Sequence, residues 1–62
     1  MSAAPVCGVL GVGALGGAIA ERLAAAGLTV HAHDRSPERV AALAGDVRAC
    51  ATPRELAAAC DV

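Results

Sequence analysis

Val6-Cys7-Gly8-Val9-Leu10-Gly11-Val12-Gly13-Ala14-Leu15-Gly16 is an apolar run that ends in the pattern G-x-G-x-x-G and leads directly into helix-forming sequence. Its first part, residues 6–10, is mostly apolar and β-branched, which is typical of a buried parallel strand. Gly11 suits a sharp turn from strand to helix, because glycine adopts backbone angles that a side chain forbids. Gly13 lets a ligand approach the backbone closely, and Gly16 lets the helix lie tight against the strand.

The residues after the turn offer backbone N–H groups that have no partner inside the helix. Together with the positive end of the helix dipole, these donors suit a doubly charged pyrophosphate. The chain contains no Lys, and its first Arg is Arg22, so a cationic side chain is not part of the pattern. The motif therefore predicts a dinucleotide-binding loop whose cofactor-binding residues are Gly11, Val12, Gly13, Ala14, Leu15 and Gly16.

The sequence that follows this loop has the context that a dinucleotide site requires. Apolar residues recur at helical spacing over residues 14–26, and Gly27 stands where the residue after a helix is expected. A second strand, residues 28–33, ends at Asp34, which lies 18 residues after Gly16. That distance is close to the spacing of about 20 residues expected for the acid that binds the adenosine ribose. The other interpretation is a loop of small residues with an incidental surface Asp.

Capping residues predict two further helices. Ser36 precedes Pro37, so a second helix is expected over residues 37–44 with Ser36 as its N-cap and Gly45 closing it. Residues 46–51 are expected to form a short linking segment. Thr52 and Glu55 have the spacing of a capping box and open a third helix that ends near Cys60. The last two residues, 61–62, look like the first step of another strand.

This order of elements predicts an α/β fold, the start of a Rossmann-type parallel sheet. The elements run β-α-β-α, then a short third helix and the beginning of a third strand, so the sheet is expected to be incomplete. We expect residues 1–62 to be the N-terminal portion of a dinucleotide-binding domain, with no complete second domain. The chain has no Phe, Tyr or Trp, and we expect it to be at best marginally stable alone.

Composition narrows the setting. The net charge of −1 provides no basic surface for nucleic acid. Residues 1–20 carry no charged side chain, but they lack the basic region of a signal peptide and hold too many glycines for a spanning helix. We therefore expect a cytoplasmic protein without a membrane or nucleic-acid partner.

Cysteine and histidine residues do not form a recognisable metal pattern. The three cysteines, Cys7, Cys50 and Cys60, are odd in number and contain no C-x-x-C, which favours small apolar residues in a reducing cytosol. His31 and His33 point to one face of the second predicted strand, as two metal ligands could. Because no third ligand is evident, packing against a helix or at a sheet edge is the favoured interpretation, and no metal is expected.

At the level of whole motifs, the chain resembles the amino-terminal domain of the 3-hydroxyisobutyrate dehydrogenase family, also called the β-hydroxyacid dehydrogenases. This family shares its cofactor domain with 6-phosphogluconate dehydrogenase. The resemblance rests on residues 8–16, on Asp34-Arg35-Ser36, and on the segment from Thr52 to Val62. The glycine motif occurs in many dehydrogenases, whereas Gly45, Thr52-Pro53 and Glu55 match a region that is more specific to this family.

The resemblance implies an oxidoreductase that transfers a hydride between NAD or NADP and a β-hydroxy acid, in a parent protein that we expect to be a homo-oligomer. The family's substrate-binding segment and catalytic lysine lie well beyond position 62. Because the chain has no Lys, we expect it to hold no catalytic residue and to be inactive alone.

Asp34 and Arg35 are the residues expected to set the choice of cofactor. Asp34 favours NAD, because its carboxylate binds the ribose 2′-hydroxyl and repels a 2′-phosphate. Arg35 favours the opposite choice, or stacks on adenine. The prediction is NAD or NADP with NAD slightly favoured; Arg35 as a solvated loop residue is the other interpretation.

Three other functions stay open. The double glycine at Gly16-Gly17 with residues 34–37 also resembles prephenate dehydrogenase, although Thr52-Pro53 argues against it. An FAD enzyme shares the first strand and loop but usually ends the second strand in Glu. The remaining alternative is a non-catalytic nucleotide-binding or interaction module.

Overall fold

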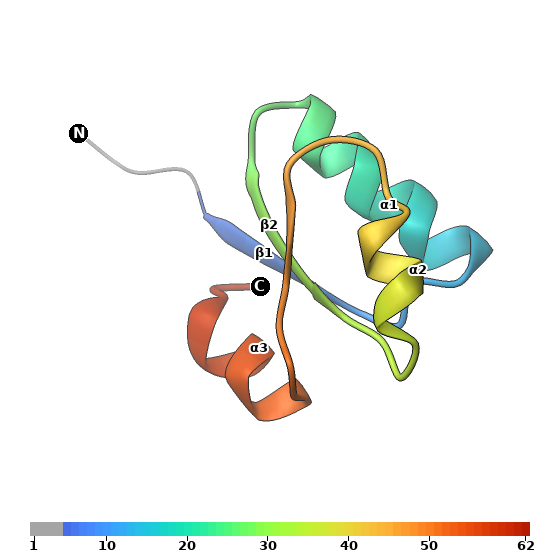
Figure 1. Cartoon of the computed structure of the whole chain (residues 1–62). Helices are drawn as coiled ribbons and strands as arrows, with labels where there is room; N and C mark the ends of the chain where they lie inside the picture. The colour runs from blue at the N-terminus through green and yellow to red at the C-terminus, as the bar shows by residue number, and fades with distance from the viewer. Residues whose placement is uncertain (1–4) are drawn as a thin grey trace.

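The computed structural model describes residues 5–62, which form three parallel strands and three helices (Figure 1). The elements in chain order are β1 (Val6–Leu10), α1 (Ala14–Ala25), β2 (Thr29–His33), α2 (Pro37–Ala41), β3 (Val47–Ala49) and α3 (Pro53–Ala59). Helices α1 and α2 lie on one side of the sheet and α3 lies on the other. The expected α/β fold with a Rossmann-type parallel sheet is confirmed.

Strand β2 is the central strand of the sheet. It pairs in parallel with β1, where Leu10 lies opposite His33, and with β3, where His31 lies opposite Arg48. The register brings the carboxyl ends of β1 and β2 to the same edge. The turn after β1 and the turn after β2 therefore lie side by side, which is where the candidate site is built.

Helix α1 ends at Ala25, one residue before the expected end, and the predicted glycine follows it. Gly27 has a φ of +88°, a left-handed conformation that glycine adopts without strain. The N–H of Gly27 donates to the carbonyl of Ala24 at 3.0 Å, and the N–H of Leu28 donates to the carbonyl of Leu23 at 3.2 Å. These two bonds form a Schellman motif, which satisfies carbonyls at the helix end and turns the chain into β2.

Helix α2 is shorter than the expected span of residues 37–44. It ends at Ala41, because Leu43 donates to the carbonyl of Val40 at 3.1 Å and Ala44 donates to Glu21 Oε2 of α1 at 2.7 Å. The second bond is a tertiary contact that replaces a helical one. Ser36 stands at the N-cap position, but its hydroxyl makes no capping bond.

Helix α3 begins at the predicted capping box. Thr52 Oγ1 accepts the N–H of Glu55 at 3.1 Å, and Glu55 Oε2 accepts the N–H of Ala51 at 3.0 Å. The reciprocal bond of the capping box thus goes to Ala51, the residue before the N-cap, and not to the N-cap Thr52 itself. Leu56 is buried, and Cys60 lies just after the helix.

The prediction that residues 46–51 form only a linking segment was wrong, because they contain β3. Residues 61–62, expected to begin a third strand, follow this missed strand instead. They lie along the other edge of β1, where the N–H of Gly8 donates to the carbonyl of Val62 at 2.6 Å. Strand β1 thus has β2 on one side and residues 61–62 on the other.

The main core lies between the sheet and the pair α1 and α2. It is centred on Val12, Ala32 and Val40, with half-buried Val9, Leu43 and Val47 packed against it. On the opposite side, Gly8 allows α3 to end close to β1: a Cβ at this position would lie 2.7 Å from Cys60 Sγ. Small side chains therefore set the spacing of the layers.

Candidate cofactor-binding site

The glycine loop, residues 11–16, turns the chain from β1 into α1. Gly11 has a φ of +87°, so the predicted sharp turn needs glycine at this position. Its N–H donates to the carbonyl of His33 at 2.8 Å and continues the bonding between β1 and β2. A Cβ at Gly16 would collide with the carbonyl oxygen of Gly11. Gly16 is therefore required for α1 to start this close to the turn.

Asp34 joins the glycine loop to the turn after β2. Its Oδ2 accepts the N–H of Val12 at 2.9 Å, and its Oδ1 accepts the N–H of Ser36 at 2.9 Å. One carboxylate thus fixes two loops that are adjacent only in space.

These two hydrogen bonds set the charge state of Asp34. The N–H groups of Ser36 and then of Val12 stabilise the ionised form and lower the pKa of Asp34 below its ordinary value of 3.8, and Arg39 lowers the pKa further. Partial burial opposes this effect but is smaller. The site therefore carries a carboxylate at neutral pH.

The N-terminus of α1 is open to an anionic ligand. Gly13 is the N-cap, no side chain among residues 5–62 caps the helix there, and its first turn contains no acidic residue. A Cβ built on Gly13 meets no atom within 4 Å, so the space beside it is free. Ala14 and Leu15 follow with exposed positions. Backbone donors at such an end bind phosphate oxygens without help from a cation.

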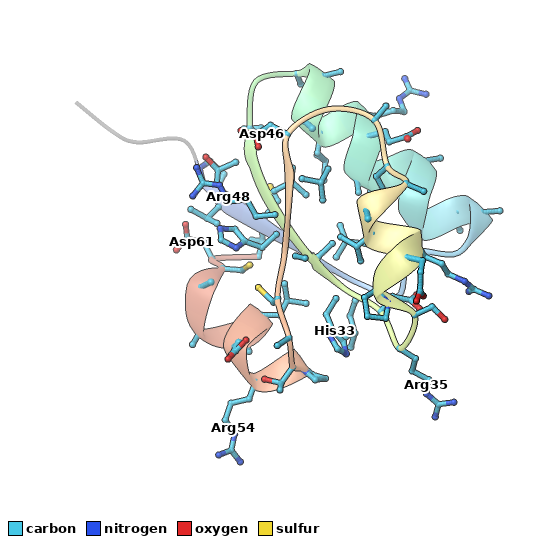
Figure 2. All side chains as sticks on the ribbon, in the orientation of Figure 1. His33, Arg35, Asp46, Arg48, Arg54 and Asp61 are labelled. Atoms are coloured by element: carbon cyan, nitrogen blue, oxygen red, sulfur yellow. The ribbon has the colours of Figure 1, made fainter. Side chains whose placement is uncertain are left out.

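An open pocket of about 550 Å³ lies beside the loop at the carboxyl ends of β1 and β2. Its lining includes Gly11, His33, Asp34, Arg35, Arg39 and Pro53. In Figure 2, His33 and Arg35 lie at this end of the sheet, and Arg35 extends outward from the turn before α2. Apolar surface from α3 and charged groups from the β2–α2 turn therefore meet in one pocket.

His33, Arg39 and Pro53 were not predicted as site residues. His33 directly precedes Asp34, and its strand position points it to the α3 side, which could have indicated a contact with the pocket. Arg39 lies in α2 and Arg35 lies in the turn just before this short helix, so both are near its start. Pro53 reaches the pocket only through the tertiary packing of α3.

The two histidines of β2 have different partners. His33 Nδ1 lies 2.9 Å from the carbonyl oxygen of Cys50, and His31 Nδ1 lies 3.7 Å from Cys50 Sγ. Burial raises the pKa of the Cys60 thiol, with further contributions from Cys50 and Asp61.

In residues 5–62, no three His, Cys, Asp or Glu side chains are grouped to hold a metal ion. The same residues contain no helix with the length and apolar character needed to cross a membrane.

A comparison with protein families shows which family the chain belongs to. Residues 6–62 match the family described as the NAD binding domain of 6-phosphogluconate dehydrogenase. The chain belongs to this family. The match confirms the family resemblance of the sequence and the expectation of NAD or NADP as the cofactor.

The chain is also similar to a protein with a named activity. The chain is 49% identical over 57 residues to L-threonate dehydrogenase from Cupriavidus necator. The aligned region covers 89% of this chain and 19% of the relative, so the chain spans about a fifth of the length of that protein. No solved structure matches the chain.

The residues that match the family include every element of the candidate site. The glycine loop, Asp34 and the pocket all fall in residues 6–62. The chemistry of the donors fits a dinucleotide: backbone N–H groups for phosphate, a carboxylate for ribose hydroxyls, and a partly apolar pocket for a flat ring.

Proposed function

We propose that this chain is the cofactor-binding part of an NAD(P)-dependent dehydrogenase that acts on a β-hydroxy acid by hydride transfer. The observation that carries the proposal is the bond between Asp34 and Val12, which holds the ribose-binding acid against the glycine loop. Residues 1–62 would then be the N-terminal portion of the dinucleotide-binding domain. The cofactor, when bound, would supply the hydride acceptor or donor.

Each part of the site has a separate task in this proposal. Backbone N–H groups of Gly13, Ala14 and Leu15 bind the pyrophosphate, with the positive end of α1 behind them. Gly11 and Gly16 keep the loop in the shape that exposes these donors. Asp34 accepts hydrogen bonds from the ribose hydroxyls, because each of its oxygens has a further lone pair beyond the bonds to Val12 and Ser36.

The charges around the pocket support NAD as the better cofactor. Asp34 is held ionised by two backbone N–H groups, so a 2′-phosphate would meet a carboxylate that cannot turn away without breaking them. Arg35 and Arg39 line the same pocket and would attract a 2′-phosphate. We propose that the fixed carboxylate prevails and that NADP binds more weakly, because both arginine side chains are exposed and solvated.

The substrate of the whole protein is proposed from the relative's name. L-threonate carries a hydroxyl group on the carbon β to its carboxylate, which is the chemistry expected for this class of dehydrogenase. We propose a hydroxylated acid of this type as substrate. Because the chain spans 19% of the relative's length, the reaction is assigned to a protein that joins this segment to a substrate-binding part.

The proposal also includes the location, the assembly and the partners of the protein. The net charge of −1 and the three free cysteines support a cytoplasmic protein without a nucleic-acid partner, whereas the homo-oligomer is proposed from the family match. Analytical ultracentrifugation of a longer protein containing this segment would test the assembly, and a monomer would contradict it.

Direct titration with reduced cofactors tests the proposal. The chain has no Trp, Tyr or Phe, so nicotinamide fluorescence is measured without a protein background. We expect saturable binding of NADH and about tenfold weaker binding of NADPH. Asp46→Asn, which removes an exposed carboxylate in the α2–β3 turn, is the control and should leave both affinities unchanged. Absence of binding for both cofactors by a chain that circular dichroism shows to be folded would refute the function, and a preference for NADPH would refute the choice of NAD.

A further inference from the structure

We infer that His33 selects adenine as the base of the cofactor, by accepting a hydrogen bond from the exocyclic amino group at Nε2. This inference rests on the proposed dinucleotide function and adds a specificity residue to it. Neither the glycine loop nor Asp34 can make this selection, because they offer groups suited to phosphate and ribose. The base must be distinguished by a side chain elsewhere in the pocket.

The hydrogen bond to Cys50 determines which nitrogen of His33 is protonated. Nδ1 lies 2.9 Å from the carbonyl oxygen of Cys50, and a carbonyl oxygen can only accept. Whenever the ring is neutral, its proton is therefore on Nδ1. Nε2 is left with a lone pair, so it presents an acceptor and no donor.

The backbone around His33 fixes the ring's position. Its own carbonyl accepts the N–H of Gly11 at 2.8 Å, and Cys50 is held by its N–H bond to the carbonyl of Ala32 at 2.8 Å. The side chain therefore has a rigid strand on one side and a fixed carbonyl on the other. The ring does not need to be ordered by the ligand, which lowers the entropy cost of binding.

The surroundings of the ring suit a flat heterocycle. His33 lines the pocket together with Asp34, on which the ribose is proposed to bind, and with Leu10 and Pro53, which add apolar surface. Figure 2 shows His33 at the end of the sheet, near the turn that leads into α2. A base attached to a ribose held at the next residue would therefore lie within reach of the imidazole.

An acceptor at Nε2 distinguishes adenine from hypoxanthine. Adenine carries an amino group, a donor, where hypoxanthine carries a carbonyl oxygen, an acceptor. Hypoxanthine would place two acceptors against each other and leave both without a partner, which is costlier than the loss of one bond. Because the pocket is open to water, we expect a difference of about tenfold in the dissociation constant.

The test compares NADH with its hypoxanthine analogue, nicotinamide hypoxanthine dinucleotide in reduced form, by fluorescence titration of the chain. The unmodified chain should bind NADH about tenfold more tightly than the analogue. His33→Asn should bind the two equally, because the Asn amide nitrogen can replace Nδ1 as donor to Cys50 while no group replaces Nε2. Cys50→Ala, which keeps the carbonyl and removes the thiol, should retain the tenfold ratio.

The outcomes separate this inference from the function beneath it. Equal affinity of the unmodified chain for both dinucleotides, or a ratio that survives in His33→Asn, would overturn the role of His33 while leaving the dinucleotide site intact. Failure of the chain to bind either dinucleotide would overturn the proposed function and this inference together. Circular dichroism of each variant shows whether a lost ratio is due to lost folding.

Discussion

The N–H of Val12 donates to Asp34 Oδ2 at 2.9 Å across 22 residues of sequence. This bond connects the turn after β1 to the turn after β2, and the second oxygen of the same carboxylate holds Ser36. The residue proposed to bind ribose is therefore also the residue that shapes the phosphate loop. In the proposed function, cofactor binding and local folding therefore depend on one side chain.

Replacement of Asp34 by Asn should affect both properties. Asn offers one oxygen and one amide, so one of the two backbone N–H groups loses its acceptor and faces another donor. We expect a lower melting temperature and about tenfold weaker NADH binding, with no such loss for NADPH because the repulsion of its 2′-phosphate is removed. Circular dichroism and fluorescence titration measure the two effects.

The Asp46→Asn variant is the control for Asp34→Asn. It changes the net charge equally at an exposed position. An equal loss of affinity for NADH and NADPH in Asp34→Asn would show that the carboxylate acts only on the shape of the loop.

The stability of the chain should fall in acid through the same residue. The pKa of Asp34 is lowered in the folded state by the Ser36 and Val12 N–H groups, so ionised Asp34 stabilises the fold above about pH 3.8. This contribution is lost as the pH falls below 3.8 and through the lower folded pKa. Melting temperatures measured between pH 5 and about pH 2 should therefore converge for the unmodified chain and Asp34→Asn. A constant difference over this range would contradict the assignment.

Local sequence was sufficient to predict β1, α1, β2 and the glycine turns. Gly11 and Gly27 have the positive φ values that the predicted turns require, and Thr52 caps α3 as expected. These features depend on neighbours within a few residues, so a sequence pattern contains the cause. The position of Asp34 beside Val12 was not predictable in detail, although its spacing from the motif indicated the same site.

The errors occurred where tertiary contacts decide the structure. Strand β3 was missed because Val47–Ala49 has only three residues, including a charged one, and is ordered mainly by pairing with β2. Helix α2 was predicted too long because residues 42–44 are good helix formers, while Glu21 of α1 takes the N–H of Ala44. The proposed contribution of His33 depends on the carbonyl of Cys50, 17 residues away, which no local pattern indicates.

The isolated chain should melt at a low temperature. Its buried apolar side chains are small, and Val30 is the largest that is fully buried among the described residues. Burial of Ala and Val removes little apolar surface from water, while ordering costs on the order of 1.5 kcal/mol per residue. Far-UV circular dichroism with a thermal melt measures this property. A cooperative transition above about 50 °C would contradict the expectation.

Gly16→Ala should lower the free energy of unfolding even when no ligand is present. The new Cβ would strike the carbonyl of Gly11, a backbone atom that cannot move without opening the turn. Overpacking of this kind costs about 1–3 kcal/mol, and urea denaturation monitored by circular dichroism would measure it. Gly17→Ala is the matched comparison, because its Cβ would lie 3.1 Å from the end of the Leu43 side chain, which can shift. An equal effect of the two substitutions would contradict the packing role of Gly16.

Gly13→Ser should separate ligand binding from stability. A Cβ at this position meets nothing within 4 Å, and the φ of −66° is accessible to any residue. Serine is also a preferred N-cap, so the midpoint of unfolding should stay the same or rise by up to about 1 kcal/mol in free energy. Its hydroxyl would take the N–H groups at the start of α1 and fill the space proposed for the pyrophosphate, so NADH binding should weaken at least tenfold. Fluorescence titration beside urea denaturation measures both quantities on the same sample. Unchanged NADH affinity in a folded Gly13→Ser variant would show that the phosphates bind elsewhere than at the N-terminus of α1.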